Sequence, residues 1–190
     1  MDNLTLENQK FLLELARRAL MIYFEEGNKL SIDEDKVDDV LKQTKATFVT
    51  LTKNGNLRGC IGKLLPVQAL YLDVIENTYS AAFQDPRFDK VNQDELENLR
   101  IEISVLGIPR ELEYKDSQDL VGKLNKEKPG VILRSGYNQA TFLPQVWEDI
   151  SNPAEFLTHL CAKAGLPENY WMRGKLDIQI YEVLKFGEGK

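Results

Sequence analysis

The sequence has few of the residue types that bind metals or cross-link small folds. It contains one histidine, His159, and two cysteines, Cys60 and Cys161, which lie far apart in the chain. Two cysteines and one histidine offer no repeated metal-ligand spacing and no disulfide framework. We therefore expect both thiols to be reduced, and we expect the protein to hold no metal ion and no cofactor.

Long apolar runs and concentrated positive charge are missing as well. The longest apolar runs fall far short of the ~20 residues that a membrane-spanning helix needs. The first residues, Met1 to Glu7, lack the basic start and apolar stretch of a secretory signal. The formal net charge of -6 would repel a nucleic-acid backbone. We expect a cytoplasmic protein that binds neither nucleic acid nor a membrane.

Several catalytic signatures are also absent. The chain has no glycine-rich phosphate loop, no nucleophile elbow, no His-Glu-x-x-His pair and no cysteine triplet for an iron–sulfur cluster. These absences argue against a serine hydrolase and a metalloprotease. What remains is an ordinary globular composition, with 43% apolar and 28% charged residues, in a chain of 190 residues that can form a self-standing core.

Apolar periodicity and turn residues predict a mixture of helices and hairpins. Three helices are predicted: from about Leu6 to Glu26, from near Pro66 to the loop at Asp85, and after the cap Asn152-Pro153. The predicted strands are Ala46–Thr52, Leu57–Leu64, Leu99–Leu106, Gly130–Arg134, Gln139–Leu143 and a long terminal strand, Leu176–Phe186. Because hairpins and helices mix without regular strand–helix–strand alternation, the pattern favours an α+β fold with a mainly antiparallel sheet and flanking helices.

One short motif combines a cation, a thiol and two glycines. Its residues are Leu57-Arg58-Gly59-Cys60-Ile61-Gly62. A two-residue hairpin turn at Asn54-Gly55 would place Arg58 opposite Leu51 and Cys60 opposite Val49. Arg58, Cys60 and Gly62 would then share one face of the sheet. A guanidinium beside the sulfur would stabilise a thiolate.

The same residues also have structural explanations. A cysteine flanked by apolar residues is most simply a small buried hydrophobe. Gly59 and Gly62 fit either close packing or a backbone left open to a ligand; we predict packing at Gly59 and an open cleft at Gly62. The charge of Arg58 on a partly apolar face requires a partner, and Asp85 is the first candidate.

The motif resembles the signature of the AMMECR-one domain family, whose prokaryotic members are called system protein A of the AmmeMemoRadiSam set. The resemblance continues in chain order through Asp85-Pro86-Arg87-Phe88, Ser104-Val105-Leu106, Phe142-Leu143-Pro144-Gln145-Val146, Cys161 with Lys163-Ala164-Gly165-Leu166, and Trp171. It implies a single domain over residues 1–190 with two unequal lobes, a larger lobe containing both termini and a smaller one inserted. It also implies that the motif lies near a cleft, and that a Memo-type protein and a radical SAM enzyme are associated partners.

Two functions fit these residues. The first is a non-catalytic accessory module whose cleft binds a small anionic ligand or a segment of a partner protein. Its candidate binding residues are Arg58, Gly59, Gly62, Asp85, Arg87 and Gln145. The second is a thiol-dependent enzyme with Cys60 as its catalytic nucleophile. Such an enzyme normally needs a base within hydrogen-bond reach, and arginine cannot accept a proton, so the first function is favoured.

Overall fold

The computed structural model describes residues 4–189, which form two compact units. One unit comprises the described residues up to Leu106 together with those from Leu184 onward, and the other comprises Gly107–Val183. The chain therefore leaves the first unit once and returns to it once. That the two units make up a single domain, with the smaller lobe inserted into the larger, stays a prediction.

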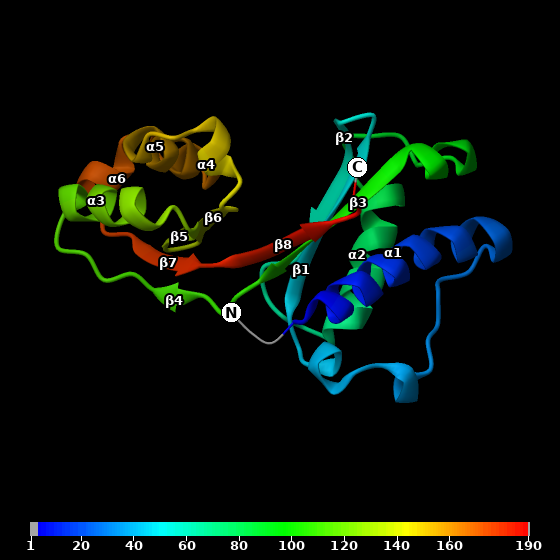
Figure 1. The fold of residues 1–190 in the computed structure, drawn as a ribbon. Helices are drawn as coiled ribbons and strands as arrows, with labels where there is room; N and C mark the ends of the chain where they lie inside the picture. The colour runs from blue at the N-terminus through cyan, green and yellow to red at the C-terminus, as the bar shows by residue number, and fades with distance from the viewer. Residues whose placement is uncertain (1–3, 190) are drawn as a thin grey trace. The chain divides into compact units, whose positions relative to one another are not determined.

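The first unit is a four-stranded sheet with helices on one face (Figure 1). The strand order is β2-β1-β3-β8, and β1 pairs antiparallel with both β2 and β3. The elements of this unit are α1 (Leu6–Glu26), η1 (Glu34–Lys36), η2 (Asp39–Lys42), β1 (Ala46–Lys53), β2 (Asn56–Gly62), α2 (Leu70–Phe83), η3 (Gln93–Asn98), β3 (Leu99–Leu106) and β8 (Val183–Gly187). Strand β2 is therefore an edge strand.

The core of the first unit lies between this sheet and helices α1 and α2. Strand β1 alternates, with Val49 and Leu51 buried toward the helices and Thr50 half-buried on the other face. Helix α1 contributes an apolar stripe at helical spacing, Leu12, Leu15, Ala16 and Ala19. Thr5 caps the start of α1, and Gly27, with a φ of 72°, ends it.

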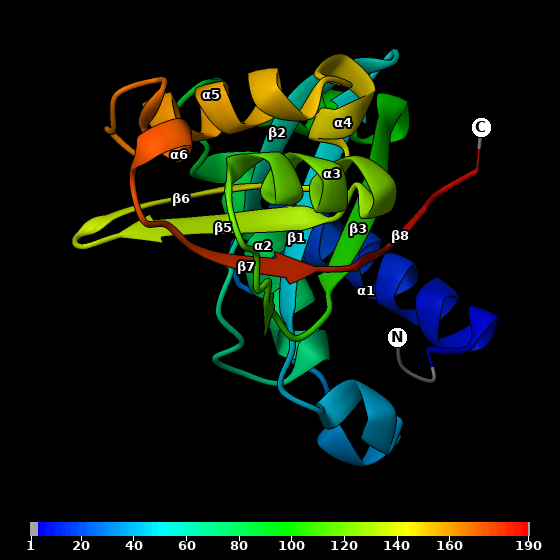
Figure 2. The same ribbon diagram turned by 90° about the vertical axis from the view of Figure 1, so that its left-hand side faces the viewer.

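The second unit is a smaller sheet with helices on one side, as Figure 2 shows. The strand order is β4-β7-β5-β6, with antiparallel pairing throughout. Its elements are β4 (Arg110–Glu111), α3 (Ser117–Glu127), β5 (Gly130–Ser135), β6 (Asn138–Phe142), α4 (Val146–Asp149), α5 (Pro153–Lys163), α6 (Tyr170–Arg173) and β7 (Asp177–Tyr181). The core of this unit contains Leu120 of α3, Phe156 and Leu160 of α5, and Cys161.

The fold class predicted from the sequence is confirmed, and several elements match closely. The chain is α+β with antiparallel sheets and flanking helices. The first helix and the strand at 99–106 have the predicted bounds. Asn54-Gly55 forms the two-residue turn of the first hairpin, with positive φ at both positions. Asn152 caps α5 through its side chain, and Pro153 occupies the first helical position.

Two predicted elements are wrong, and both errors come from tertiary pairing. The terminal strand is two strands, because β7 pairs in one sheet and β8 in the other, while the apolar alternation runs through both. Helix α2 begins at Leu70, later than Pro66. The Leu70 N–H donates to Gln43 and the Gln68 carbonyl accepts from Lys45, so this segment is tied to the chain before β1 and stays extended.

Candidate functional site

The motif at 57–62 forms most of strand β2, and a β-bulge there changes which residues share a face. Thr52 pairs with Leu57, but Leu51 pairs with Gly59 and Thr50 with Cys60, so Arg58 is the extra residue. The prediction that Cys60 lies opposite Val49, and Arg58 opposite Leu51, is therefore wrong. The bulge moves the thiol from the helix-covered face to the face that carries Thr50.

Asp85 and Arg87, from the loop after α2, bind the edge of β2 at Cys60. The Asp85 carboxylate accepts the Cys60 backbone N–H at 2.9 Å, and Arg87 Nη2 donates to the Cys60 carbonyl at 3.1 Å. The two side chains also pair with each other, Arg87 donating from Nε at 2.9 Å and from Nη2 at 2.7 Å. These hydrogen bonds hold the pKa of Asp85 well below its usual range, with Arg87 as the largest cause.

Arg58 pairs with Glu95, so the predicted pairing with Asp85 is wrong. Its Nε and Nη2 both donate to the Glu95 carboxylate at 2.9 Å, and its other donors reach the carbonyl oxygens of Asp89 and Lys90. The arginine and glutamate side chains are 15% and 12% exposed. Arg58 lowers the pKa of Glu95 to about 2. Asp85 is unavailable because Arg87, two residues away, already occupies it.

The Cys60 thiol lies beside Arg87 rather than Arg58. Cys60 is half-buried, and the Thr50 hydroxyl lies 3.2 Å from its sulfur as a hydrogen-bond donor. The pKa of Arg87 is raised, first by its hydrogen bond to Asp85, next by the charge of that carboxylate, and less by the neighbouring Cys60 side chain. The prediction that Arg58 supplies a cation beside the thiol is therefore wrong, and the arginine that binds Cys60 comes from the loop at 85–88. Cys161, in contrast, is buried in the core of the second unit.

Both glycines of the motif are closely packed. A Cβ at Gly59 would overlap the carbonyl oxygen of Ala81 in α2, which confirms the predicted packing there. A Cβ at Gly62 would overlap the carbonyl oxygen of Thr47 and the ring of Phe48. The prediction that Gly62 faces an open cleft is therefore wrong, because strand β1 fills the space beside it.

The remaining predicted residue, Gln145, precedes α4 in the second unit. The structure places the other five binding candidates, Arg58, Gly59, Gly62, Asp85 and Arg87, in the first unit together with Cys60. Within residues 4–189, no group of three or more histidine, cysteine, aspartate or glutamate side chains could hold a metal ion. In the same range no helix is long and apolar enough to cross a membrane.

Some residues near the motif were not indicated by the sequence patterns. Asp73 of α2, fully buried, accepts hydrogen bonds from the backbone N–H and hydroxyl of Thr47 and from Asn77. This network fixes α2 to β1 beside Gly62. Asp73 and Asn77 are polar residues four positions apart on the apolar face of α2. Two polar residues at this spacing on a buried helix face predict a hydrogen-bonded pair, and this pattern could have identified them. Glu95 completes a capping box with Asn92, a spacing that marks a helix start but not its pairing with Arg58.

Comparison with known proteins assigns the chain to a family. The family model described as AMMECR1 matches residues 13–186. The chain belongs to the AMMECR1 family. Protein MK0488 of Methanopyrus kandleri is 38% identical over 98% of this chain and 91% of its own length. A protein of Methanothermobacter thermautotrophicus is 38% identical over 97% of this chain and 96% of its own length. The crystal structure of the uncharacterized protein PH0010 of Pyrococcus horikoshii has a TM-score of 0.83 and 32% identity, covering 94% of this chain and 90% of that one.

Proposed function

We propose that this AMMECR1-family chain is a non-catalytic binding module that holds an anionic group at Arg87, beside the 57–62 motif. The anionic group would belong to a small ligand or to a segment of a partner protein. One observation carries the proposal. Arg87 is fixed by Asp85 and by the Cys60 carbonyl through Nε and Nη2, yet its side chain is 54% exposed and none of these fixing hydrogen bonds uses Nη1.

A fixed arginine suits recognition because less conformational freedom is lost when the ligand binds. The carboxylate of Asp85 neutralises part of the attraction for an anion, but it holds Nε and Nη2 and leaves the two N–H bonds of Nη1 available. Charge-assisted hydrogen bonds of this kind are stronger than neutral ones. We assign the ligand contact to Arg87 in place of Arg58, because Glu95 and two carbonyl oxygens engage Arg58.

The other candidates would act through shape and support. Gly59 and Gly62 let α2 and β1 approach β2 closely, and Asp85 orients Arg87. Arg58 ties the bulge of β2 to the segment around Asp89, which follows the loop that carries Arg87. In this proposal these residues position the binding group. Gln145 stays a candidate of the second unit without a defined role.

The test is an NMR titration that follows arginine Nε–H signals, with inorganic phosphate and an acidic peptide as probes. We expect a saturable shift of the Arg87 signal, and loss of binding in Arg87→Gln. Arg110→Gln is the matched control, because Arg110 is also an exposed arginine in a carboxylate pair, with Glu127 at 2.7 Å. Equal effects of both probes on Arg87 and Arg110 would mean nonspecific charge attraction and would refute the proposal.

A thiol-dependent enzyme with Cys60 as nucleophile is the second candidate. The observation that favours it is the pair of groups at the sulfur, the Thr50 hydroxyl and the cation of Arg87. Within residues 4–189, no histidine, lysine or carboxylate forms a hydrogen bond to this sulfur, so a general base is missing from the site. Alkylation of the native protein by iodoacetamide distinguishes the candidates. Rapid labelling of Cys60 that slows in Arg87→Gln would support the enzyme, whereas labelling no faster than that of free glutathione would oppose it.

The cellular setting belongs to the same proposal. We place the protein in the cytoplasm as a system protein A of the AmmeMemoRadiSam type, with a Memo-type protein and a radical SAM enzyme as associated partners. The support is the resemblance of the sequence motifs, together with membership of the AMMECR1 family. Size-exclusion chromatography of this chain mixed with each purified partner tests it. Co-elution that Arg87→Gln abolishes would identify the partner that supplies the anionic group.

A further inference from the structure

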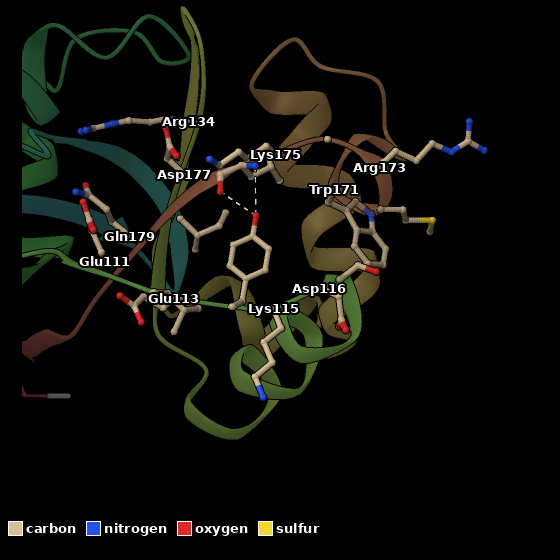
Figure 3. A pocket seen from close by; sticks show the side chains of 17 residues that line it. Glu111, Glu113, Lys115, Asp116, Arg134, Trp171, Arg173, Lys175, Asp177 and Gln179 are labelled. Atoms are coloured by element: carbon tan, nitrogen blue, oxygen red, sulfur yellow. Dashed lines mark hydrogen bonds between the residues drawn. The ribbon is translucent and has the colours of Figure 1, made fainter.

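The second unit contains an open hollow where strands β4 and β7 diverge. Their hydrogen bonding ends where the Leu112 N–H donates to the Ile178 carbonyl at 2.9 Å. Beyond this point the chain at 113–116 leaves the sheet toward α3. The hollow has a volume of about 900 Å³ and is lined by this segment, by the segment from α6 to β7, and by Arg134 of β5 (Figure 3). No residue of the 57–62 motif lines it.

Two aromatic side chains give the hollow a rigid apolar surface. The Tyr114 hydroxyl donates to the Leu176 carbonyl at 2.8 Å and accepts the Leu176 N–H at 3.2 Å, the two dashed lines in Figure 3. The Tyr114 hydroxyl thus satisfies the backbone N–H and carbonyl of Leu176, beyond the last hydrogen bond between the β4 and β7 segments. Trp171 also lines the hollow, and its indole N–H donates to the Thr158 hydroxyl at 3.1 Å. Both rings are therefore held in place by hydrogen bonds.

The charged side chains of the hollow form two walls of opposite sign. The wall at 111–116 carries Glu111, Glu113 and Asp116 against one cation, Lys115. The other wall carries Arg134, Arg173 and Lys175 against one carboxylate, Asp177. In Figure 3, Glu113, Lys115 and Asp116 lie in the lower part of the view, and Arg134, Asp177 and Lys175 lie in the upper part. A ligand with a single charge would be repelled by one wall, whereas a ligand carrying both charges would be attracted by both.

These opposite charges do not neutralise one another. In the second unit the ion pairs among described residues join Arg110 to Glu127, Lys123 to Asp119 and His159 to Glu155, all outside the hollow. Arg134 adds a further sign, because its Nε is buried and has no hydrogen-bond partner within residues 4–189. Unsatisfied buried donors are rare in native proteins, so Arg134 Nε is a donor that an acceptor group entering the hollow would satisfy.

We propose that this hollow binds a small zwitterionic ligand of the amino-acid or short-peptide type. Its negative group would meet the wall of Arg134 and Lys175, its positive group would meet the wall of Glu111 and Glu113, and its apolar body would lie against Trp171. The volume is within the range usual for small-molecule sites. The site is independent of the anion site proposed at Arg87, since all its lining residues belong to the second unit.

The two indole N–H signals in an NMR spectrum test this site. Both tryptophans are buried, but Trp171 lines the hollow, whereas Trp147 stacks on Phe156 away from the lining residues and serves as an internal control. The probe is the tripeptide alanyl-tyrosyl-alanine in three forms: with both ends free, with the amino end acetylated, and with both ends blocked. We expect a saturable shift of the Trp171 signal alone, with the free form binding most tightly and the doubly blocked form least.

Substitutions of exposed charged residues test whether binding depends on the charges that line the hollow or on the general charge of the surface. Lys175→Gln and Glu113→Gln should each weaken binding of the free tripeptide by roughly threefold to tenfold. Lys126→Gln is the control, since Lys126 is an exposed lysine on α3 that does not line the hollow. The proposal is overturned if no form shifts the Trp171 signal, if the blocked form binds as tightly as the free one, or if Lys126→Gln weakens binding as much as Lys175→Gln.

Discussion

The Asp85 carboxylate and the backbone of Cys60 are hydrogen-bonded as though a strand lay beside β2. The Cys60 N–H donates to Asp85, and Arg87, held by the same carboxylate, donates to the Cys60 carbonyl. Unpaired N–H and C=O groups on an edge strand can pair with another chain, and here an ion pair covers them. The two motif segments, 57–62 and 85–88, therefore form one structural unit.

This arrangement predicts that Asp85 contributes strongly to stability. The Asp85 side chain is 2% exposed and accepts hydrogen bonds from Arg87 and from the Cys60 backbone. Asp85→Asn should lower the free energy of unfolding by ~1 to 3 kcal/mol, because hydrogen bonds to a charged group are lost. Urea unfolding followed by circular dichroism measures the change. Asp39→Asn, at a side chain 96% exposed, should change it by less than about 0.5 kcal/mol; equal effects of the two variants would contradict the assignment.

Arg58→Ala should destabilise the fold by ~2 to 4 kcal/mol, chiefly because it leaves the mostly buried Glu95 without its main partner. Lys53 and the Asn92 N–H still bind that carboxylate, which limits the loss. A double-mutant cycle with Glu95→Gln isolates the pairwise energy. Arg58→Lys should recover only part of the stability, since lysine cannot form the two parallel hydrogen bonds. A cost below about 1 kcal/mol for Arg58→Ala would show that the pair behaves as an exposed one.

The acid range tests the same pair in a different way. The pKa of Glu95 is lowered to about 2 in the fold, whereas an unperturbed glutamate has a pKa of ~4.3. Because the pKa of Glu95 is lower in the folded state than in the unfolded state, its ionised carboxylate stabilises the fold at any pH above the unfolded-state pKa. This stabilisation is lost as the pH falls from the unfolded-state pKa through the folded-state pKa. The difference in unfolding free energy between the wild type and Glu95→Gln should therefore stay constant down to about pH 5 and shrink below it. A difference that does not change with pH would rule out the lowered pKa.

The sequence could predict elements that are specified locally, and it failed where tertiary pairing decides. Periodicity and caps located α1, β3 and α5, because their signals lie within the elements themselves. The bulge at Arg58 has no local signature, yet this one residue moved Cys60 to the other face of the sheet. The partner of Arg58 also differs from the prediction, because Arg87 occupies Asp85 and Glu95 binds Arg58. The fold places most of the candidate residues in the first unit, as the motifs suggested. Their roles, however, depend on the pairing register of β1 and β2, which the turn at Asn54-Gly55 did not determine by itself.

The two glycines of the motif provide the last test, now with the same expected outcome for both. Gly59→Ala would push a methyl group into the backbone of α2, and Gly62→Ala would push one into the backbone of β1, so each should cost ~1 to 3 kcal/mol. Gly122→Ala is the matched control, because this glycine lies inside α3 and a Cβ there would meet open space. The control should be neutral or more stable by up to about 1 kcal/mol, since alanine favours a helix. Thermal melts of the three variants measure these changes. A Gly62→Ala variant as stable as Gly122→Ala would contradict the close packing at Gly62 and would support the prediction of an open cleft there.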